Sequence, residues 1–294
     1  MVKPTYMNIC NTVDAMRTAC RAARLKGKRL GLVPTMGALH EGHLSLVRAA
    51  KAQSDVVAAS IFVNPTQFAP NEDFNKYPRA FERDCELLEK EGVDLLFAPS
   101  LEEMYPQKPI TYVTVEGLSD KLCGRSRPGH FRGVTTVVAK LFHIIEPDVA
   151  FFGQKDLVQL TLIRRMVRDL NFPVEIVGCP IVREPDGLAM SSRNAYLSPE
   201  QRRQALVLYR SLTRVQADFR TGERNAARLI SAGREIFSAE SSVRLDYLEI
   251  VDPETLDPVT EVDRPGLVAV AAFVGTTRLI DNVVLQALPE NDDH

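Results

Sequence analysis

The sequence has no surplus of positive charge, few cysteines and no long apolar run, and each absence removes a class of protein. Its 36 Lys and Arg residues face 38 Asp and Glu, a formal net charge of −2. This balance argues against a nucleic-acid binder, because binding to a phosphate backbone draws on excess Lys and Arg. The first residues contain no apolar signal core, and no run reaches the about 20 residues that cross a bilayer. We therefore expect a cytoplasmic protein that binds neither nucleic acid nor membrane.

The cysteines are five, an odd number, and they are scattered along the chain. No two stand close enough for a pair of metal ligands, and the odd count does not suit a disulfide framework. With 45% hydrophobic and 25% charged residues, the composition is that of a folded globular protein. A length of 294 residues allows one large domain or two of ordinary size.

From Gly31 to about residue 180, short apolar runs alternate with amphipathic segments. Strands are predicted at 31–33, 56–63, 93–98, 148–153 and 174–178, and helices at 43–53, 79–92, 133–145 and 156–170. The run 56–63 is apolar on both faces, which is typical of a strand buried in a parallel sheet. The alternation predicts an α/β domain, with helices on both faces of a mostly parallel sheet. Ligands of such sheets bind at the carboxyl ends of the strands.

The pattern changes after about residue 180. Helices are predicted at 199–218 and 223–238, followed by strands at 243–251 and 266–274. We interpret this part as a smaller α+β domain. The predicted division is therefore residues 1–180 and 181–294.

The segment PTMGALHEGHLSLV, residues 34–47, places two histidines at a helix start directly after a strand. His40 and His43 are three residues apart, so their imidazoles should lie on the same helix face. The free N–H groups and positive dipole end of that helix suit a phosphate, and the imidazoles can stabilise charge that grows on it during displacement. Two ordinary histidines beside a turn are the plainer alternative, but the HxGH spacing after a strand is more specific.

Polar side chains follow two further strands and should reach the same sheet edge. Asn64 and Gln67, in FVNPTQF, carry amides that bind hydroxyls and carboxylates without adding charge. Lys155, in FFGQKD, is a candidate for the ATP polyphosphate, and Gln159 lies one helical turn beyond it. Taken alone, each would be an ordinary polar turn or a solvated lysine.

A third polar segment, GLAMSSRNAYLSP (187–199), lies near the predicted domain boundary. Ser191, Ser192 and Arg193 offer two hydroxyls and a forked guanidinium, a good set for phosphate oxygens. A mobile loop here could close over bound ATP and exclude water. Such Ser- and Asn-containing loops are common, so this segment gains meaning only together with the others.

HEGH (40–43) resembles the HIGH signature of the nucleotidyltransferase superfamily, and MSSRN (190–194) resembles its KMSKS-type counterpart. PTMGALHEGH, FVNPTQF, GRSRPGHFRGV (124–134), FGQKD and DGLAMSSRN occur in the order and spacing of the pantoate–β-alanine ligase (pantothenate synthetase) family. The resemblance spans nearly the whole chain from about Gly31.

The resemblance implies a two-step reaction. Pantoate and ATP give pantoyl adenylate and pyrophosphate, and β-alanine then displaces AMP to give pantothenate. It also implies a Rossmann-like amino-terminal domain, a smaller carboxyl-terminal lid domain, Mg²⁺ and a homodimer.

Several residue roles follow from the resemblance alone. His43 matches the proposed catalytic histidine and would act with His40 and Lys155. The pantoate site is matched by Gln67 and Gln159, together with Asn64. Asp84 stands where an acidic residue near the magnesium is expected. The implied ATP contacts are Met36, Gly37, Ala38, Leu39, His40, Glu41, Gly42, His43, Gly153, Gln154, Lys155, Asp156, Val182, Met190, Ser191, Ser192 and Arg193.

Three residues of the GRSRPGHFRGV segment have two possible roles. Arg125, His130 and Arg132 either close the substrate site or shape a glycine-rich loop.

Two rival functions fit parts of the sequence. A nucleotidyltransferase that makes a dinucleotide-like product would keep the fold and change the acceptor, but the paired amides favour a polyhydroxy acid. A nucleotide-sensing or RNA-binding module would bind ATP without turnover, and the near-neutral charge disfavours RNA.

Overall fold

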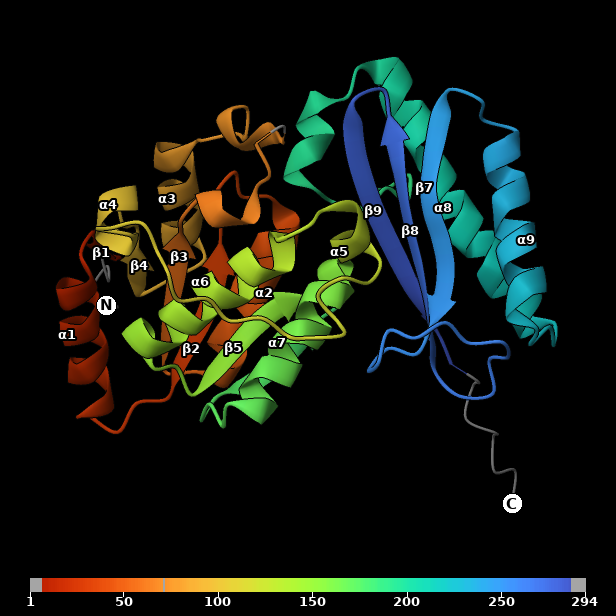
Figure 1. The fold of residues 1–294 in the computed structure, drawn as a ribbon. Coiled ribbons are helices and arrows are strands. Elements are labelled where there is room, and N and C mark those ends of the chain that lie inside the picture. The colour runs from red at the N-terminus through yellow and green to blue at the C-terminus, as the bar shows by residue number, and fades with distance from the viewer. Residues whose placement is uncertain (1–6, 71, 287–294) are drawn as a thin grey trace. The chain divides into compact units, whose positions relative to one another are not determined.

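The computed structural model describes residues 7–70 and 72–286, and in it the chain divides into two compact units. The first comprises the residues up to Gln154 together with Gln159–Val182. The second comprises the residues from Arg183 onward and the short segment Lys155–Val158. Figure 1 shows the elements of each unit along the chain.

The first unit is built on a six-stranded sheet in which every pairing is parallel. Its strand order is β1-β4-β3-β2-β5-β6. The strands are β1 (Asn8–Cys10), β2 (Leu30–Thr35), β3 (Val56–Ile61), β4 (Leu95–Phe97), β5 (Val149–Gly153) and β6 (Glu175–Cys179). From β2 the chain adds β3 and β4 on one side, and it then continues with β5 on the other side of β2. The strand order therefore reverses between β2 and β5. Ligands of open α/β sheets bind outside the carboxyl ends of the strands at such a reversal.

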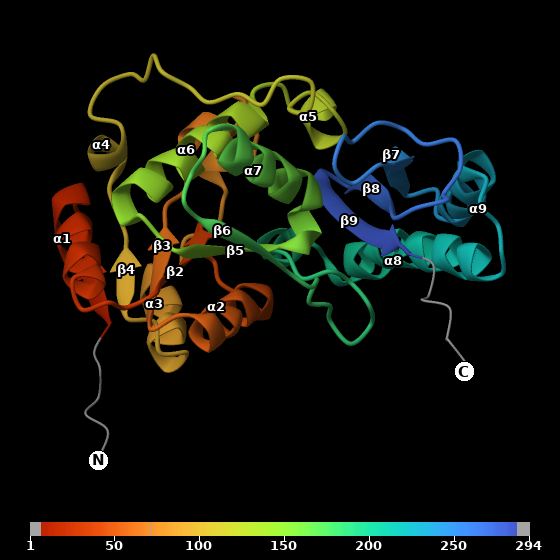
Figure 2. The same cartoon turned by 90° about the horizontal axis from the view of Figure 1, so that it is seen from below.

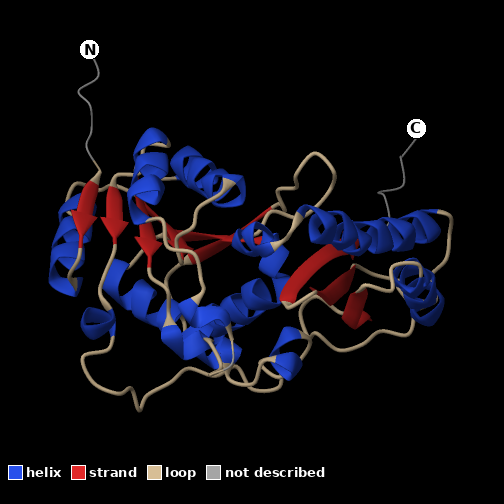
Figure 3. Ribbon diagram, turned by 90° about the horizontal axis from the view of Figure 1, so that it is seen from above, coloured by secondary structure: helices blue, strands red, loops and turns tan. Residues whose placement is uncertain are grey.

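Helices cover both faces of this sheet. Figure 2 shows α2 and α3 on one face and α6 and α7 on the other, and Figure 3 shows helices on both sides of the strands. The helices of this part are α1 (Val13–Arg24), α2 (Glu41–Gln53), α3 (Phe81–Lys90), α4 (Leu101–Met104), α5 (Cys123–Ser126), α6 (His130–Ile145) and α7 (Leu157–Asp169). Leu32 and Val33 are neighbours in β2 and point to opposite faces, yet neither is exposed. The predicted Rossmann-like α/β fold is thereby confirmed.

Some predicted bounds shift, and several elements were missed, among them the short helices α4 and α5. Helix α2 begins at Glu41 rather than residue 43, and α6 begins at His130 rather than residue 133. The β-branched Thr135 is accommodated inside α6 because its hydroxyl donates to the carbonyl of Phe131 at 2.8 Å. Strand β1 and helix α1 precede Gly31, where the predicted alternation began.

The second unit places two helices against a three-stranded antiparallel sheet of order β7-β8-β9. Its elements are α8 (Pro199–Arg220), α9 (Ala226–Ser238), β7 (Val243–Val251), β8 (Gly266–Val274) and β9 (Thr277–Leu285). Leu212 of α8, Leu229 of α9 and Val270 of β8 are fully buried in one core. Strand β9 was not predicted, because Arg278, Asp281 and Asn282 interrupt its apolar pattern. No helix within the described ranges is both long and apolar enough to cross a bilayer.

Candidate active site

The loop after β2 is held by a buried carboxylate. Gly37 and Ala38 have left-handed backbone, with φ of 80° and 51°. Asp84 of α3, 1% exposed, accepts the amide of Ala38 at 2.7 Å and that of Leu39 at 2.8 Å. Burial raises the pKa of the Asp84 carboxyl, and the two amide hydrogen bonds oppose that shift. Asp84 therefore fixes the loop that leads into α2, a role that sequence reasoning missed.

The two histidines of this loop cap helix α2. His40 is the residue before its first turn, and its Nδ1 accepts the amide of Gly42 at 3.1 Å. His43 Nδ1 accepts the amide of His40 at 3.3 Å, and the two ring centroids lie 4.1 Å apart. Because each Nδ1 accepts, a neutral ring carries its proton on Nε2, where it can donate to a ligand. Glu41, at the start of α2, is exposed and pairs with Arg48.

Gln67 lies in a short 3₁₀ turn, η1 (Pro65–Gln67), directly after β3. Its side-chain Oε1 accepts from Asn64 Nδ2 at 3.1 Å, and its Nε2 lies 3.1 Å from the sulfur of Met36. The segments around Met36 and Gln67, both singled out in the sequence, therefore meet at the ends of the adjacent strands β2 and β3.

Asn64 is a buried amide with several hydrogen-bond partners rather than an exposed one. It is 1% exposed, and its Oδ1 accepts from the hydroxyl of Tyr105 at 3.0 Å and that of Thr66 at 2.9 Å. Its Nδ2 also donates to the carbonyl of Gly133 at 3.1 Å. In this structure the amide of Asn64 fixes Gln67 in place.

Helix α6 approaches this turn so closely that only glycine fits at the contact. A Cβ on Gly133 would stand 2.3 Å from the carbonyl oxygen of Thr66 and 2.6 Å from the amide nitrogen of Gln67. Both are backbone atoms, which cannot rotate away. Gly133 thus sets the distance between α6 and the Gln67 turn.

A polar network holds the other side of the same turn. Arg127 Nε donates to Glu72 Oε1 at 2.6 Å and Arg127 Nη2 donates to Oε2 at 2.7 Å. Arg127 Nη1 lies 3.0 Å from His130 Nε2, and His130 Nδ1 lies 2.8 Å from the carbonyl oxygen of Gln67. Arginine can only donate, so His130 accepts at Nε2 and donates from Nδ1 to Gln67. Burial alone would raise the pKa of Glu72, but the hydrogen bonds and charge of Arg127 outweigh it and lower that pKa.

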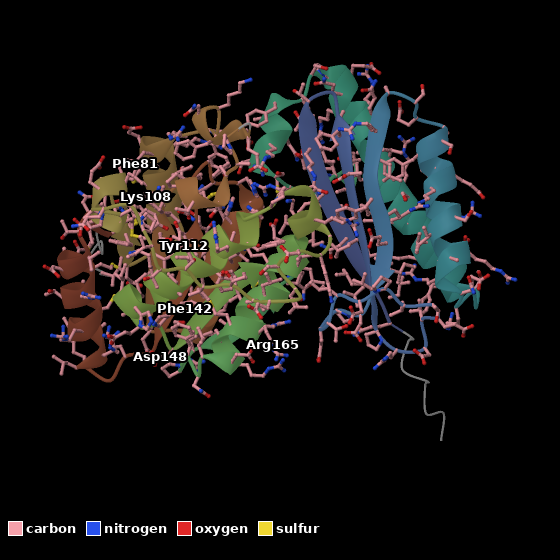
Figure 4. All side chains as sticks on the ribbon, in the orientation of Figure 1. Phe81, Lys108, Tyr112, Phe142, Asp148 and Arg165 are labelled. Carbon is pink, nitrogen blue, oxygen red and sulfur yellow. The ribbon has the colours of Figure 1, made fainter. Side chains whose placement is uncertain are left out.

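The neighbouring arginines differ from His130. Arg125 and Arg132 are exposed, and Arg132 lies over the ring of Tyr112, 4.5 Å from its centroid. Tyr112, labelled in Figure 4, belongs to a segment that precedes α6 in the chain and contacts it, because the Val113 amide donates to the Thr136 hydroxyl at 3.0 Å. Sequence reasoning named these two arginines and His130 but passed over Arg127, the arginine between them that contacts the Gln67 turn.

The other predicted site residues of the first unit follow strands β5 and β6. Gly153 ends β5 beside β2, Gln154 follows it, and Gln159 lies in the first turns of α7. Val182 is partly buried at the end of the first unit. The topology places Gln67, His40 and Gln159 after the neighbouring strands β3, β2 and β5.

Lys155 belongs to the second unit. It lies in the 3₁₀ turn η3 (Gln154–Asp156), and its Nζ is 3.9 Å from a carboxylate oxygen of the exposed Asp156. Its side chain is 19% exposed.

Met190–Arg193 belongs to the same unit and leads into the 3₁₀ turn η4 (Ser192–Tyr196). The hydroxyl of Ser191 caps that turn by accepting the amide of Arg193 at 3.3 Å. Asn194 Nδ2 then anchors the segment to the Glu184 carboxylate and the Ala189 carbonyl, at 3.1 Å each.

Within the described ranges, no three His, Cys, Asp or Glu side chains form a cluster that could hold a metal. Asp84 is the one predicted magnesium residue, and both its oxygens accept backbone amides. The donor set therefore does not fit a metal cage made by the protein alone.

The sequence also matches known proteins over nearly its whole length. The sequence profile of pantoate-beta-alanine ligase matches residues 8–284. The chain is 61% identical over 281 residues to a pantothenate synthetase of Koribacter versatilis, covering 96% of this chain and 97% of that protein. The chain belongs to the pantoate-beta-alanine ligase family. This confirms the family and the enzyme class expected from the five motifs.

Solved structures agree. A crystal structure of pantothenate synthetase from Thermus thermophilus matches with a TM-score of 0.90 and 51% identity, covering 94% of this chain and 99% of that one. The pantoate-beta-alanine ligase of Francisella tularensis, complexed with beta-gamma ATP and beta-alanine, matches with a TM-score of 0.78 and 35% identity, covering 95% and 97%.

Proposed function

We propose that the chain condenses pantoate with β-alanine to pantothenate through a pantoyl-adenylate intermediate, consuming ATP and releasing AMP and pyrophosphate. One observation carries the proposal. The Gln67 amide, suited to hydroxyls and a carboxylate, lies against Met36 in the loop that opens α2, whose start suits a phosphate. A carboxylate held there would face an α-phosphate at the helix start. Its attack needs alignment and charge stabilisation rather than a protein nucleophile.

In this proposal the two histidines act on the phosphate. His43 and His40 donate from Nε2 as charge develops, with Nδ1 of each ring fixed by a backbone amide. Gln67 and Gln159 bind pantoate, and Asn64 acts by holding Gln67.

The two predicted domains divide the work. Residues 1–180 bind nucleotide and pantoate, while 181–294 act as a lid that shields the adenylate from water. Lys155 and Met190–Arg193, which share the second unit, contribute phosphate contacts. The positive charge of Lys155 and the fork of Arg193 suit phosphate oxygens.

Mg²⁺ would arrive with ATP. This ion commonly binds substrate phosphates and water, with only one or two carboxylates from the protein. Asp84 accepts two amides of the loop, and its predicted metal role stays a prediction. Its two amide bonds give it a structural task in any case.

We also propose a cytoplasmic homodimer. The free thiols Cys10, Cys20, Cys85 and Cys179 agree with a reducing compartment. A monomer at micromolar concentration in sedimentation equilibrium would refute the dimer.

The decisive assay is product formation. Pantoate, β-alanine and MgATP should give stoichiometric pantothenate, AMP and pyrophosphate. Release of ADP and phosphate, or no turnover despite ATP binding, would point to another reaction or to a non-catalytic nucleotide binder.

A further inference from the structure

A buried ion pair in the second unit joins elements that are far apart in sequence. Arg183 donates to both oxygens of Asp281 in β9, from Nη1 at 2.6 Å and from Nη2 at 2.9 Å. The Asp281 residue is 4% exposed. A bidentate pair of this kind fixes orientation as well as distance.

The next residue, Asn282, connects the pair to Lys155. Its backbone amide donates to Asp281 Oδ1 at 2.7 Å, and its side-chain Nδ2 donates to the carbonyl oxygen of Lys155 at 2.9 Å. Asn282 is 5% exposed, so this partly buried contact is largely shielded from water. It fixes the peptide from which the Lys155 side chain projects.

Arg183 connects the same pair to the Met190–Arg193 segment. Its Nη1 also donates to the carbonyl of Gly187 at 3.1 Å, and it forms an antiparallel bridge with Ala189, directly before Met190. The adjacent Glu184 accepts from Asn194, just after Arg193. One chain of contacts thus links Lys155 to the segment 190–193.

We propose that Asp281 and Asn282 are positioning residues for adenylation, holding Lys155 and, through Arg183, the segment 190–193 in one fixed arrangement. The inference rests on the assignment of Lys155 to the ATP site proposed above. A buried ion pair adds little net stability compared with well-packed apolar side chains of similar volume. The chemistry of this pair is therefore better explained by the geometry it imposes on its neighbours.

A double-mutant cycle tests this. Single-turnover formation of pantoyl adenylate is measured for Asn282→Asp, Lys155→Met and the double variant. Asn282→Asp keeps the shape and replaces the donor with an acceptor facing the Lys155 carbonyl. We expect it to slow adenylation about 10-fold or more. In the Lys155→Met background the same change should have no further effect, because its consequence passes through Lys155.

Ser211→Ala is the matched control. Ser211 is buried in the same unit and donates to the carbonyl of Gly233 at 2.9 Å. Its loss should lower the melting temperature and leave adenylation unchanged. A general loss of stability in the unit therefore cannot imitate the expected result.

The outcomes are separable. Normal adenylation by Lys155→Met would overturn the proposed role of Lys155 and this inference with it. A slow Lys155→Met with a normal Asn282→Asp, or two losses that multiply in the double variant, would overturn the positioning role alone. If Asn282→Asp does not fold, Asn282→Ser, which adds no charge, is measured in the same cycle against the same outcomes.

Discussion

Replacing Gly133 with alanine should weaken pantoate binding although this residue has no side chain to offer a substrate. The new Cβ would stand 2.3 Å from the Thr66 carbonyl oxygen and 2.6 Å from the Gln67 amide nitrogen. Helix α6 and the η1 turn must then separate. Asn64, which bonds both Gly133 and Gln67, would have to give up one partner.

The magnitude follows from opposing effects. Alanine in a helix interior gains about 1 kcal/mol over glycine, while overpacking a core typically costs about 1–3 kcal/mol. Because the clash is with backbone, we expect a net loss of about 1–2 kcal/mol in the free energy of unfolding. Displacing a buried hydrogen-bonding amide costs about 1–3 kcal/mol, so pantoate affinity should fall roughly 5- to 150-fold.

Calorimetric titration measures the affinities for pantoate and for ATP, and urea unfolding measures the free energy of unfolding. Gly233→Ala is the control. Its Cβ would meet Leu248 Cδ2 at 2.6 Å and Val215 Cγ2 at 2.9 Å, in the core of the other unit. It should change stability and leave pantoate affinity unaltered. Unchanged pantoate affinity in folded Gly133→Ala would refute the account of how Gln67 is positioned.

Substitutions at three further positions test separate parts of the site. His43→Ala should slow adenylation roughly a hundred- to a thousandfold with little change in ATP affinity. His43→Asn, which can still cap α2, should be equally slow. Near-normal rates would show that His43 takes no part in the chemistry. Gln67→Ala should weaken pantoate binding by about 1–3 kcal/mol and spare ATP binding, and equal losses for both ligands would contradict its assignment. Because the folded-state pKa of Glu72 is lowered, its stabilisation is present above the unfolded pKa and is lost as pH falls through the folded value. The stability difference between wild type and Glu72→Gln should therefore shrink as pH falls below the ordinary glutamate value of 4.5, and a difference that grows in acid would show that Arg127 does not lower this pKa.

Sequence patterns predicted the parts of the fold that periodicity encodes. The run 56–63 is apolar on both faces, and its residues Val56–Ile61 form β3 in the middle of the parallel sheet. The carboxyl ends of adjacent strands then bring the His40 and Gln67 segments together. Strand β9 escaped notice because Asp281 and Asn282 make it look polar, although both are buried by partners distant in sequence.

The supports of the site could not be predicted for a related reason. Asp84 lies 46 residues from the Ala38 amide that it binds. Arg127 lies 60 residues from the Gln67 carbonyl. Such contacts depend on tertiary packing and leave no local spacing to read. The close approach at Gly133 was equally hidden, since a glycine within a helical run gives no sign of what faces it.

The exchange of labelled pyrophosphate into ATP tests the central claim most directly, because it reports the adenylate before any amine enters. With pantoate, MgATP and pyrophosphate present and β-alanine absent, the enzyme should exchange label at a rate that depends on pantoate. Exchange that strictly requires β-alanine, or that is absent from an enzyme that still makes pantothenate, would contradict a free-standing pantoyl-adenylate step.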